Sequence, residues 1–393
     1  MVDNSLYAAM QQQLGMISMN FKRYLYDELP DARLIGVVGP RGVGKSTLLL
    51  QKIVESEENK LYVDADNIYF STHRLVDLAD SFVKDGGRFL AIDEIHKYEG
   101  WSRELKQIHD TNPSLKVMFT GSSILDIKKG TSDLSRRALM YEMQGLSFRE
   151  YLELFHGRKV PVYSLDEIIN HDVMMLSPES EIPQHPLPYF REYLRTGYFP
   201  FSNEEGFEIR LNQIISQTVE SDIPLYAGFM ASTARKLKQL MGVLSRLAPY
   251  KPSVEKLSQE IGVSKNTLPG YLAMLEKAGM IALLRDDTSG MRVLGKIEKL
   301  YLDNTNLMYA MAGVNTDIGS VRETFFQNQM RLRYNVSASR ISDFRIGDYT
   351  FEVGGKNKGQ SQIAEAKNGI VVKDDIEFGN GNIVPLWHFG LTY

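Results

Sequence analysis

The sequence contains no cysteine, no long apolar run and no strong excess of charge of either sign. Without cysteine, the chain cannot form disulfides, thiolate metal sites, iron–sulfur clusters or a thiol nucleophile. None of its apolar runs approaches the roughly 20 residues that a membrane-spanning helix needs. The N-terminal stretch MVDNSLYAAMQQQLGM lacks the basic start and the apolar core of a signal peptide. We therefore expect a cytoplasmic protein that makes no contact with a membrane.

What is present is the composition of an ordinary globular chain, with 393 residues, 43% hydrophobic and 24% charged, and a formal net charge of −4. This length predicts two to four domains of about 100–200 residues each. The charge is unevenly spread. Residues 151–230 carry 5 basic and 12 acidic side chains, whereas residues 231–300 carry 12 basic and 6 acidic ones. The basic segment is either a face for a polyanion such as DNA or a solvated surface that docks on the acidic segment.

Apolar strand patterns alternate with helical patterns in the first part of the chain. Strands are expected at 34–38, 61–66, 88–94 and 115–123, and helices at 75–84 and 101–112. This alternation predicts a parallel sheet with helices on both faces. The predicted organisation is an α/β core, an acidic helical region, a winged helix-turn-helix and a C-terminal α/β domain, over residues 1–145, 146–230, 231–300 and 301–393.

Residues 39–46, GPRGVGKS, fit the G-x-x-x-x-G-K-[ST] pattern of a phosphate-binding P-loop. Its glycines let backbone N–H groups wrap a phosphate, and the N-terminus of the following helix adds a favourable dipole. We expect Lys45 to reach the β- and γ-phosphates, Ser46 to bind Mg²⁺ and Thr47 to bond the α-phosphate. The predicted nucleotide-binding residues are Gly39, Pro40, Arg41, Gly42, Val43, Gly44, Lys45, Ser46 and Thr47.

The strand RFLAIDE supplies the acidic partners of such a site. Asp93 and Glu94 stand at its C-terminal end, which is the edge where open α/β sheets bind ligands. We expect Asp93 to hold Mg²⁺ directly or through water, and Glu94 to orient the attacking water as a general base would. The N-K-x-D element of guanine recognition is absent, because the Asn-Lys pair at 59–60 is followed by Leu and Tyr. The sequence therefore favours ATP over GTP.

Two further elements are candidates for the catalytic site. Ser122 follows the fourth strand, which we expect beside the P-loop strand, and it would sense the γ-phosphate or orient the water. The alternative is a turn rich in small residues. Arg136 and Arg137 are of the residue type that offsets transition-state charge, because the guanidinium fork matches phosphate oxygens. The alternative for these arginines is a surface salt bridge.

Residues 253–284 show a helix, a short glycine turn, a second helix and a strand, the order of a winged helix-turn-helix. In such modules the second helix enters the major groove of DNA, here with Lys265, Asn266 and Thr267 at its start. The Pro-Gly pair at 269–270 falls inside that helix and predicts a late start or a distortion. Since this type of fold also serves as a protein–protein module, DNA and protein both stay open as partners.

The C-terminal part contains an outline of a metal-dependent nuclease site, formed by Glu323, Asp343, Glu352 and Lys356. The usual E-x-K spacing puts both side chains on one face of a strand. Here Lys356 stands four residues after Glu352, with two glycines between them, which makes a bulge or turn more plausible. We therefore expect a folded domain without nuclease activity.

Five segments together resemble prokaryotic AAA-type (AAA_14) P-loop ATPases that carry a C-terminal domain of unknown function, DUF4143. The resemblance implies an AAA-like core, a helical region, a winged-helix module and a restriction-endonuclease-like C-terminal fold. It also places an arginine finger at Arg136 or Arg137. The segments are GPRGVGKSTLL, LAIDEIHK, FTGSS, SRRALMYEMQGLSFREYLEL and FEVGGKNKGQ with the later PLWHFG.

The leading hypothesis is a Mg²⁺-dependent ATPase whose nucleotide state moves the C-terminal modules. Its catalytic groups would be Lys45, Glu94, Ser122 and an arginine, Arg136 or Arg137, of the same chain or of a neighbouring subunit. The alternatives are a nucleotide-gated DNA-binding module acting through residues 251–300, a protein-interaction switch with little turnover, and an ATP-regulated nuclease. The expected ligands are ATP and Mg²⁺, and the candidate partners are DNA, another protein and a second copy of the chain.

Overall fold

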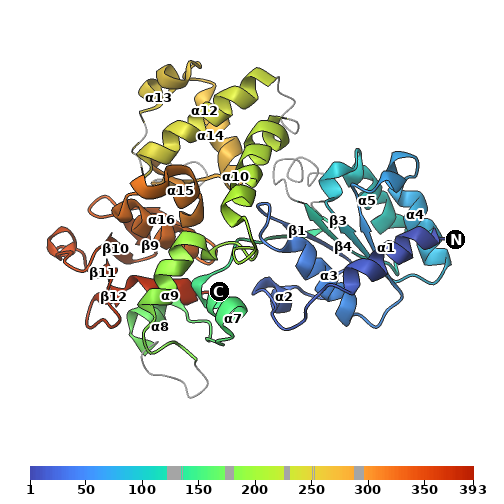
Figure 1. Cartoon of the computed structure of the whole chain (residues 1–393), viewed down its shortest axis with the longest axis horizontal. Helices are drawn as coiled ribbons and strands as arrows, with labels where there is room; N and C mark the ends of the chain where they lie inside the picture. The colour runs from blue at the N-terminus through green and yellow to red at the C-terminus, as the bar shows by residue number, and fades with distance from the viewer. Residues whose placement is uncertain are drawn as a thin grey trace. The chain divides into compact units, whose positions relative to one another are not determined.

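The computed structural model describes residues 1–121, 134, 136–172, 181–224, 231–249, 251, 253–286 and 296–393. The chain divides into two compact units. Met1–Gly145 form the first, drawn in blue to teal in Figure 1, and Leu146–Pro224 with the described residues of 231–393 form the second. Within these described ranges, no helix combines the length and the apolar composition that crossing a bilayer requires. The finer division at residues 230 and 300 stays a prediction.

The first unit is built on a sheet of five parallel strands in the order β2-β3-β4-β1-β5. Four of these strands were predicted, and so was the pairing of β4 with β1, which the structure confirms. The fifth was not predicted, because LMYE is a short, half-exposed edge strand without an apolar run. The strands are β1 (Leu34–Val38), β2 (Lys60–Asp64), β3 (Phe89–Asp93), β4 (Lys116–Gly121) and β5 (Leu139–Glu142).

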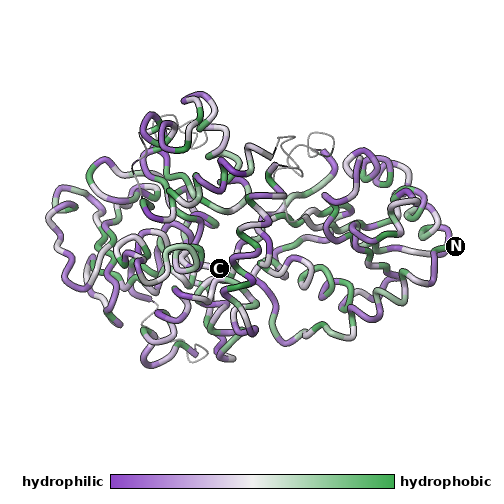
Figure 2. The backbone as a smooth tube through the Cα atoms, turned by 45° about the horizontal axis from the view of Figure 1, so that its top comes forward, coloured by the Kyte–Doolittle hydropathy of each residue, from purple (hydrophilic) through white to green (hydrophobic). Residues whose placement is uncertain are grey.

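Helices cover both faces of this sheet, as the sequence predicts. Helix α3 packs against β3 and β4 on one face. On the other face, Phe82 of α4 and Leu105 of α5 join one apolar cluster with Leu90 of β3. Figure 2 shows hydrophobic stretches inside the unit and hydrophilic ones on its outer turns. The helices are α1 (Asn4–Leu14), α2 (Leu25–Glu28), α3 (Lys45–Glu55), α4 (Leu75–Lys84) and α5 (Trp101–Thr111).

The alternation of side chains along each strand decides which residues face α3. Leu90 belongs to the cluster under α4 and α5, so its neighbours Phe89 and Ala91 point to the opposite face. By the same period of two, Asp93 at the end of β3 shares the α3 face. Thr120 is two residues after Met118, which is in register with Ala91, and it therefore lies on this face as well. Helix α3 thus covers the face that carries Asp93 and Thr120.

The second unit contains a mixed sheet in the order β12-β11-β10-β9-β8 and a separate antiparallel pair, β6 and β7. Strands β10, β11 and β12 are parallel, and β8, β9 and β10 are antiparallel. Its likeness to a restriction-endonuclease fold stays a prediction. The strands are β6 (Ile281–Arg285), β7 (Ile297–Leu302), β8 (Val336–Ala338), β9 (Phe344–Ile346), β10 (Tyr349–Gly354), β11 (Gly369–Lys373) and β12 (Ile383–Pro385).

Helices are the other main elements in the described residues of the second unit, and several of them lie in the predicted helical region. Helix α16 packs on β10 and on the buried C-terminal turn Leu386–Leu391. The helices are α7 (Phe148–His156), α8 (Leu165–Ile169), α9 (Leu187–Glu192), α10 (Phe207–Gln217), α12 (Ala231–Leu247), α13 (Val254–Ile261), α14 (Leu268–Lys277), α15 (Thr305–Ala312) and α16 (Ile318–Met330).

The C-terminal turn carries an imidazole that should make this unit sensitive to acid. His388 is fully buried, and neither ring nitrogen has a hydrogen-bond partner in the structure. Burial, assisted by the nearby His171, lowers the pKa of His388 to about 3. The unfolded chain therefore binds a proton below pH 6.5 that the folded unit does not bind. Stability that is complete at neutral pH is lost as the pH falls toward 3.

Because of His388, we expect the free energy of unfolding to be about 2 kcal/mol lower at pH 5 than at pH 7.5. Denaturant unfolding at the two pH values, followed by the fluorescence of Trp387 in a Trp101→Phe background, measures this difference. His388→Phe keeps an aromatic ring at the position and cannot bind a proton. The variant should lose correspondingly less stability in acid, and an unchanged pH dependence would rule out His388 as the cause.

Candidate functional site

The P-loop connects β1 to α3 at the carboxyl edge of the first sheet. Gly44 has a left-handed backbone (φ 97°) and is the N-cap of α3. A Cβ on Gly39 would lie only 2.1 Å from the carbonyl oxygen of Met143, so no larger residue fits there without moving the backbone. The loop therefore brings the first N–H groups of α3 to the edge of the sheet, the position where helices bind anions.

The ammonium group of Lys45 lies inside this loop. The side chain is 5% exposed, and its Nζ donates to the carbonyl oxygens of Gly39 at 2.9 Å and Pro40 at 2.7 Å. Burial lowers the pKa of Lys45 to about 8, although Glu94 and Asp93 act in the opposite direction. An ammonium group has three N–H donors, so one is left over for a ligand.

The other loop residues differ in how far they reach solvent. Thr47 and Gly42 are exposed, Ser46 and Arg41 are half-buried, and Val43 is fully buried. This leaves the hydroxyl groups of Ser46 and Thr47 near the surface of the loop, where an incoming nucleotide could meet them.

Arg23 holds the P-loop in place, and sequence reasoning missed it. The side chain is 5% exposed and donates to the carbonyl oxygens of Val43, Gln144 (2.7 Å) and Gly145 (2.9 Å). It therefore ties the loop to the segment that follows β5. No local pattern around Arg23 marks this role, because its partners are 20, 121 and 122 positions away in the sequence.

Asp93 ends β3 as a buried carboxylate with three hydrogen-bond donors. The hydroxyl of Tyr62 donates to its Oδ2 at 2.8 Å, and the hydroxyl of Thr120 and the backbone N–H of Glu94 donate to its Oδ1. A carboxylate has about four lone-pair sites, so roughly one remains open. Burial, then the charge of Asp93, raise the pKa of Tyr62, which keeps this phenol protonated as a donor.

Glu94 follows in a strained backbone conformation. Its φ of 49° is unusual for a residue other than glycine, and its N–H also donates to the Thr120 hydroxyl at 3.2 Å. Such strain concentrates at functional sites. The Oε2 of Glu94 lies 3.4 Å from Nε2 of His96, a buried ring whose pKa burial lowers to about 3. His96 is therefore neutral at pH 7 and contacts Glu94 as an uncharged partner.

The two candidate arginines are in different surroundings. Arg137 forms a forked ion pair with Asp110, with nitrogen–oxygen distances of 2.7 and 2.8 Å, and this pair lowers the pKa of Asp110 to about 2. Arg136 is exposed and has no partner among the described residues. A salt bridge is thus present at Arg137, and within the described part of the chain none is present at Arg136. Ser122 lies outside the described residues.

Both arginines lie at the opposite end of the sheet from their own P-loop. Strand β5 runs parallel to β1, with Leu139 in register with Ile35. Arg136 precedes the start of β5, whereas the P-loop follows the end of β1. The strand length between the two edges is on the order of 13 Å, because a strand rises about 3.3 Å per residue.

The second helix of the predicted winged module starts late, as the Pro-Gly pair indicates. Helix α14 begins at Leu268 with a proline in its first turn, so Lys265, Asn266 and Thr267 precede the helix. Lys265 forms an ion pair with Glu255. Much of the positive charge of residues 231–300 is paired in this way with carboxylates. The cations with such partners are Lys238, Lys251, Lys265, Arg285, Lys296 and Lys299.

The carboxylates of the predicted nuclease site form ion pairs with lysines other than Lys356. The Nζ of Lys299 lies 2.9 Å from both Glu323 and Asp343. Glu352, which is 2% exposed, contacts Lys358, whereas Lys356 is exposed in the turn after β10. Among the residues that the structure describes, no group of three or more acidic, histidine or cysteine side chains could hold a metal ion.

Comparison with known proteins identifies two domains. Residues 31–152 match the model of an AAA domain (AAA_14), and residues 187–318 match a domain of unknown function (DUF8612). The sequence suggested DUF4143 for the C-terminal part, and the domain that matches is DUF8612. No curated protein matches the chain.

Two solved structures are similar to the chain at low sequence identity. One is the Walker-type ATPase PABY2304 of Pyrococcus abyssi, at 15% identity over 74% of this chain and 95% of that chain, with a TM-score of 0.45. The other is the RuvB Holliday junction branch migration motor of Thermotoga maritima, at 14% identity over 70% and 89%, with a TM-score of 0.31. Neither score is high enough to transfer a property of those proteins. Residues 31–152 of this chain are thus similar to AAA domains, and residues 187–318 are similar to the DUF8612 domain.

Proposed function

We propose that the first unit binds ATP with Mg²⁺ and hydrolyses the γ-phosphate. The observation that carries the proposal is the Lys45 ammonium, buried inside a P-loop whose backbone N–H groups lie at the same sheet edge as Asp93 and Glu94. A buried cation beside oriented N–H groups favours a polyphosphate at this edge. The two neighbouring carboxylates suit the metal ion and the attacking water.

The side chains of the P-loop and of Asp93 would bind different parts of the nucleotide and its metal ion. Lys45 would exchange its bonds to the loop carbonyls for bonds to the β- and γ-phosphates, and Thr47 would donate to the α-phosphate. Ser46 would bind Mg²⁺ through its hydroxyl. Asp93 would hold it through a water molecule, because three donors already occupy its carboxylate. The metal ion would offset negative charge on the phosphates.

Glu94 would orient the attacking water and accept its proton. Thr120 fixes the backbone N–H of Glu94, and His96 lies against its carboxylate. Because His96 is neutral, it can position Glu94 without neutralising the base. Ser122 remains a candidate for contact with the γ-phosphate.

The hydrolysis site would be completed by a second copy of the chain. Arg136 is exposed and lies at the sheet edge remote from its own P-loop, so it suits a neighbour's nucleotide rather than its own. The AAA match ends at residue 152, inside α7 of the second unit. This covalent continuity supports coupling between nucleotide state and the second unit. DNA and nuclease activity are left out of the proposal, because Lys265 is paired with Glu255 and the carboxylates of the nuclease outline are paired with Lys299 and Lys358.

Equilibrium binding of ATP to wild type and Lys45→Ala tests the proposal. Loss of charged hydrogen bonds to phosphate should weaken ATP affinity about 10- to 100-fold, and hydrolysis should fall with it. Lys106→Ala is the matched control, because Lys106 is exposed on α5. Equal ATP affinity in wild type and Lys45→Ala would overturn the assignment of the P-loop, as would a wild type that does not bind ATP.

A further inference from the structure

The first unit contains a cavity of about 320 Å³ that the nucleotide site does not use. It lies at the amino edge of the sheet, where β1, β3 and β4 begin and where α3 ends. Helix α3 has 11 residues, so its two ends are about 16 Å apart at 1.5 Å per residue. The P-loop is at one end of this helix and the cavity at the other.

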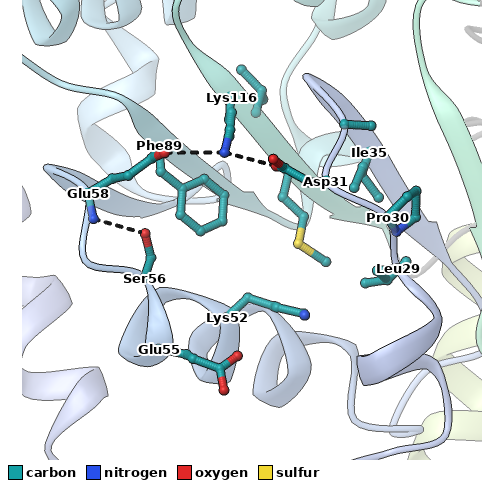
Figure 3. Close-up of a pocket in the computed structure, with 13 residues that line it drawn as sticks. Leu29, Pro30, Asp31, Ile35, Lys52, Glu55, Ser56, Glu58, Phe89 and Lys116 are labelled. Carbon is teal, nitrogen blue, oxygen red and sulfur yellow. Dashed lines mark hydrogen bonds and ion pairs between the residues drawn. The ribbon is translucent and has the colours of Figure 1, made fainter.

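The cavity has an apolar body. Figure 3 shows the ring of Phe89 and the side chains of Ile35 and Leu29 around a hollow between α3 and the sheet. A volume of about 300 Å³ is at the lower end of the range for small-molecule sites, which are mostly apolar with few polar groups. The cavity therefore suits a small molecule with an apolar body. Its apolar lining is Leu29, Pro30, Ala32, Ile35, Phe89, Val117 and Met118.

Most of the charged groups around the cavity already have partners. Lys116 pairs with Asp31 at 2.9 Å and with Glu58 at 3.2 Å. The carboxylate of Glu55 accepts from Lys22 at 3.0 Å and from the hydroxyl of Tyr26. Figure 3 shows the Glu55 carboxylate turned away from the hollow.

Lys52 is the exception among these charged groups. Its ammonium extends along the hollow in Figure 3 and lies 3.9 Å from the ring centroid of Tyr26. No oxygen acceptor for it is present among the described residues. Burial lowers the pKa of Lys52, so removal from water disfavours its charge. Its place near the C-terminus of α3 and the ring contact stabilise the cation, but neither satisfies its N–H donors.

We propose that this cavity binds a small organic acid whose single carboxylate pairs with Lys52 and whose apolar body lies against Phe89, Ile35 and Met118. One ammonium with carboxylates nearby fits a single negative charge. A phosphate group would bring more charge than one lysine offsets, and it would be repelled by Glu55, Asp31 and Glu58. The proposal does not rest on ATP hydrolysis, because it concerns a separate site.

Ligand-observed NMR titration of the full chain tests this site with three probes of similar shape. They are phenylacetate, the neutral phenylacetamide and the cationic phenethylamine. We expect phenylacetate to bind at least about tenfold more tightly than the other two, because hydrogen bonds between charged groups contribute more than neutral ones. Absence of phenylacetate binding, or equal affinity for the three probes, would overturn the proposal.

Two variants and one competitor identify the site of binding. Lys52→Gln should remove the preference for the carboxylate, and Lys116→Gln should keep it, because Lys116 is held by its own two partners. ATP with Mg²⁺ should not displace phenylacetate, since the two sites are at opposite ends of α3. Displacement by ATP would place the probe in the P-loop and overturn the proposal, as would an unchanged preference in Lys52→Gln. Each of these results is independent of whether the protein hydrolyses ATP.

Discussion

Replacing Glu94 with glutamine should lower the rate of ATP hydrolysis about 10²- to 10⁴-fold while ATP still binds. Glutamine has the size of glutamate and can still contact His96, but it cannot accept a proton from water. Lys45 and the loop N–H groups, which would bind the phosphates, are unchanged by this substitution. The expected signature is therefore a loss in kcat with little change in the affinity for ATP.

Steady-state hydrolysis and equilibrium binding, measured on the same preparations, separate the two effects. Glu99→Gln provides the matched control, because Glu99 is exposed five residues further along the chain. It should hydrolyse ATP at the wild-type rate. If Glu94→Gln also kept that rate, Glu94 could not be the residue that activates the water. If it lost ATP binding instead, the residue would serve the fold of the loop and not the chemistry.

The geometry of the candidate site could be predicted from sequence where its signal is local. The P-loop pattern and the Asp93-Glu94 pair each occupy a few consecutive residues, and the strands on which they depend are continuous apolar runs. Burial of those runs fixes the order of strand, loop and helix without knowledge of the rest of the chain. The same reasoning missed β5, because an edge strand that is half exposed has no such run.

The groups that support the site could not be predicted, because they are brought together only by packing. Tyr62 lies on β2, Thr120 on β4 and Arg23 before α2, and each makes its contact across a large sequence separation. A tyrosine in a strand or an arginine in a loop is too common to mark a contact of this kind. Their role appears when the parallel register sets the strand ends side by side.

The C-terminal part shows a second limit of local patterns. A spacing such as Glu352 to Lys356 suggests a pair only if the strand continues through both residues. Here β10 ends at Gly354, so Lys358 in the following turn reaches Glu352 instead. Lys299 comes from a different strand, β7, and pairs with two of the candidate carboxylates. Charge counts along the sequence likewise overstate the free positive charge of residues 231–300, since they do not reveal which cations have partners.

Arg136→Ala should reduce ATP hydrolysis about 10³- to 10⁵-fold if Arg136 serves as the arginine finger of a neighbouring subunit. Arg137→Ala is the matched control one residue away. Arg137 is engaged with Asp110, and an exposed ion pair of this kind contributes only about 0–1 kcal/mol to stability. Arg137→Ala should therefore keep most of the activity. If Arg137→Ala lost hydrolysis and Arg136→Ala kept it, Arg137 would be the arginine finger instead of Arg136.

Mixing two inactive variants tests whether the arginine acts between subunits. Arg136→Ala retains an intact P-loop and Glu94, and Glu94→Gln retains an intact Arg136. In a mixed oligomer, some interfaces would join a complete P-loop site to a complete arginine. The mixture should then hydrolyse ATP although neither variant does so alone. No recovery in mixtures that form mixed oligomers would contradict action between subunits. Recovery would also show that hydrolysis requires a second copy of the chain. The length of a strand separates Arg136 from the P-loop of its own chain, so Arg136 is remote from the nucleotide bound there.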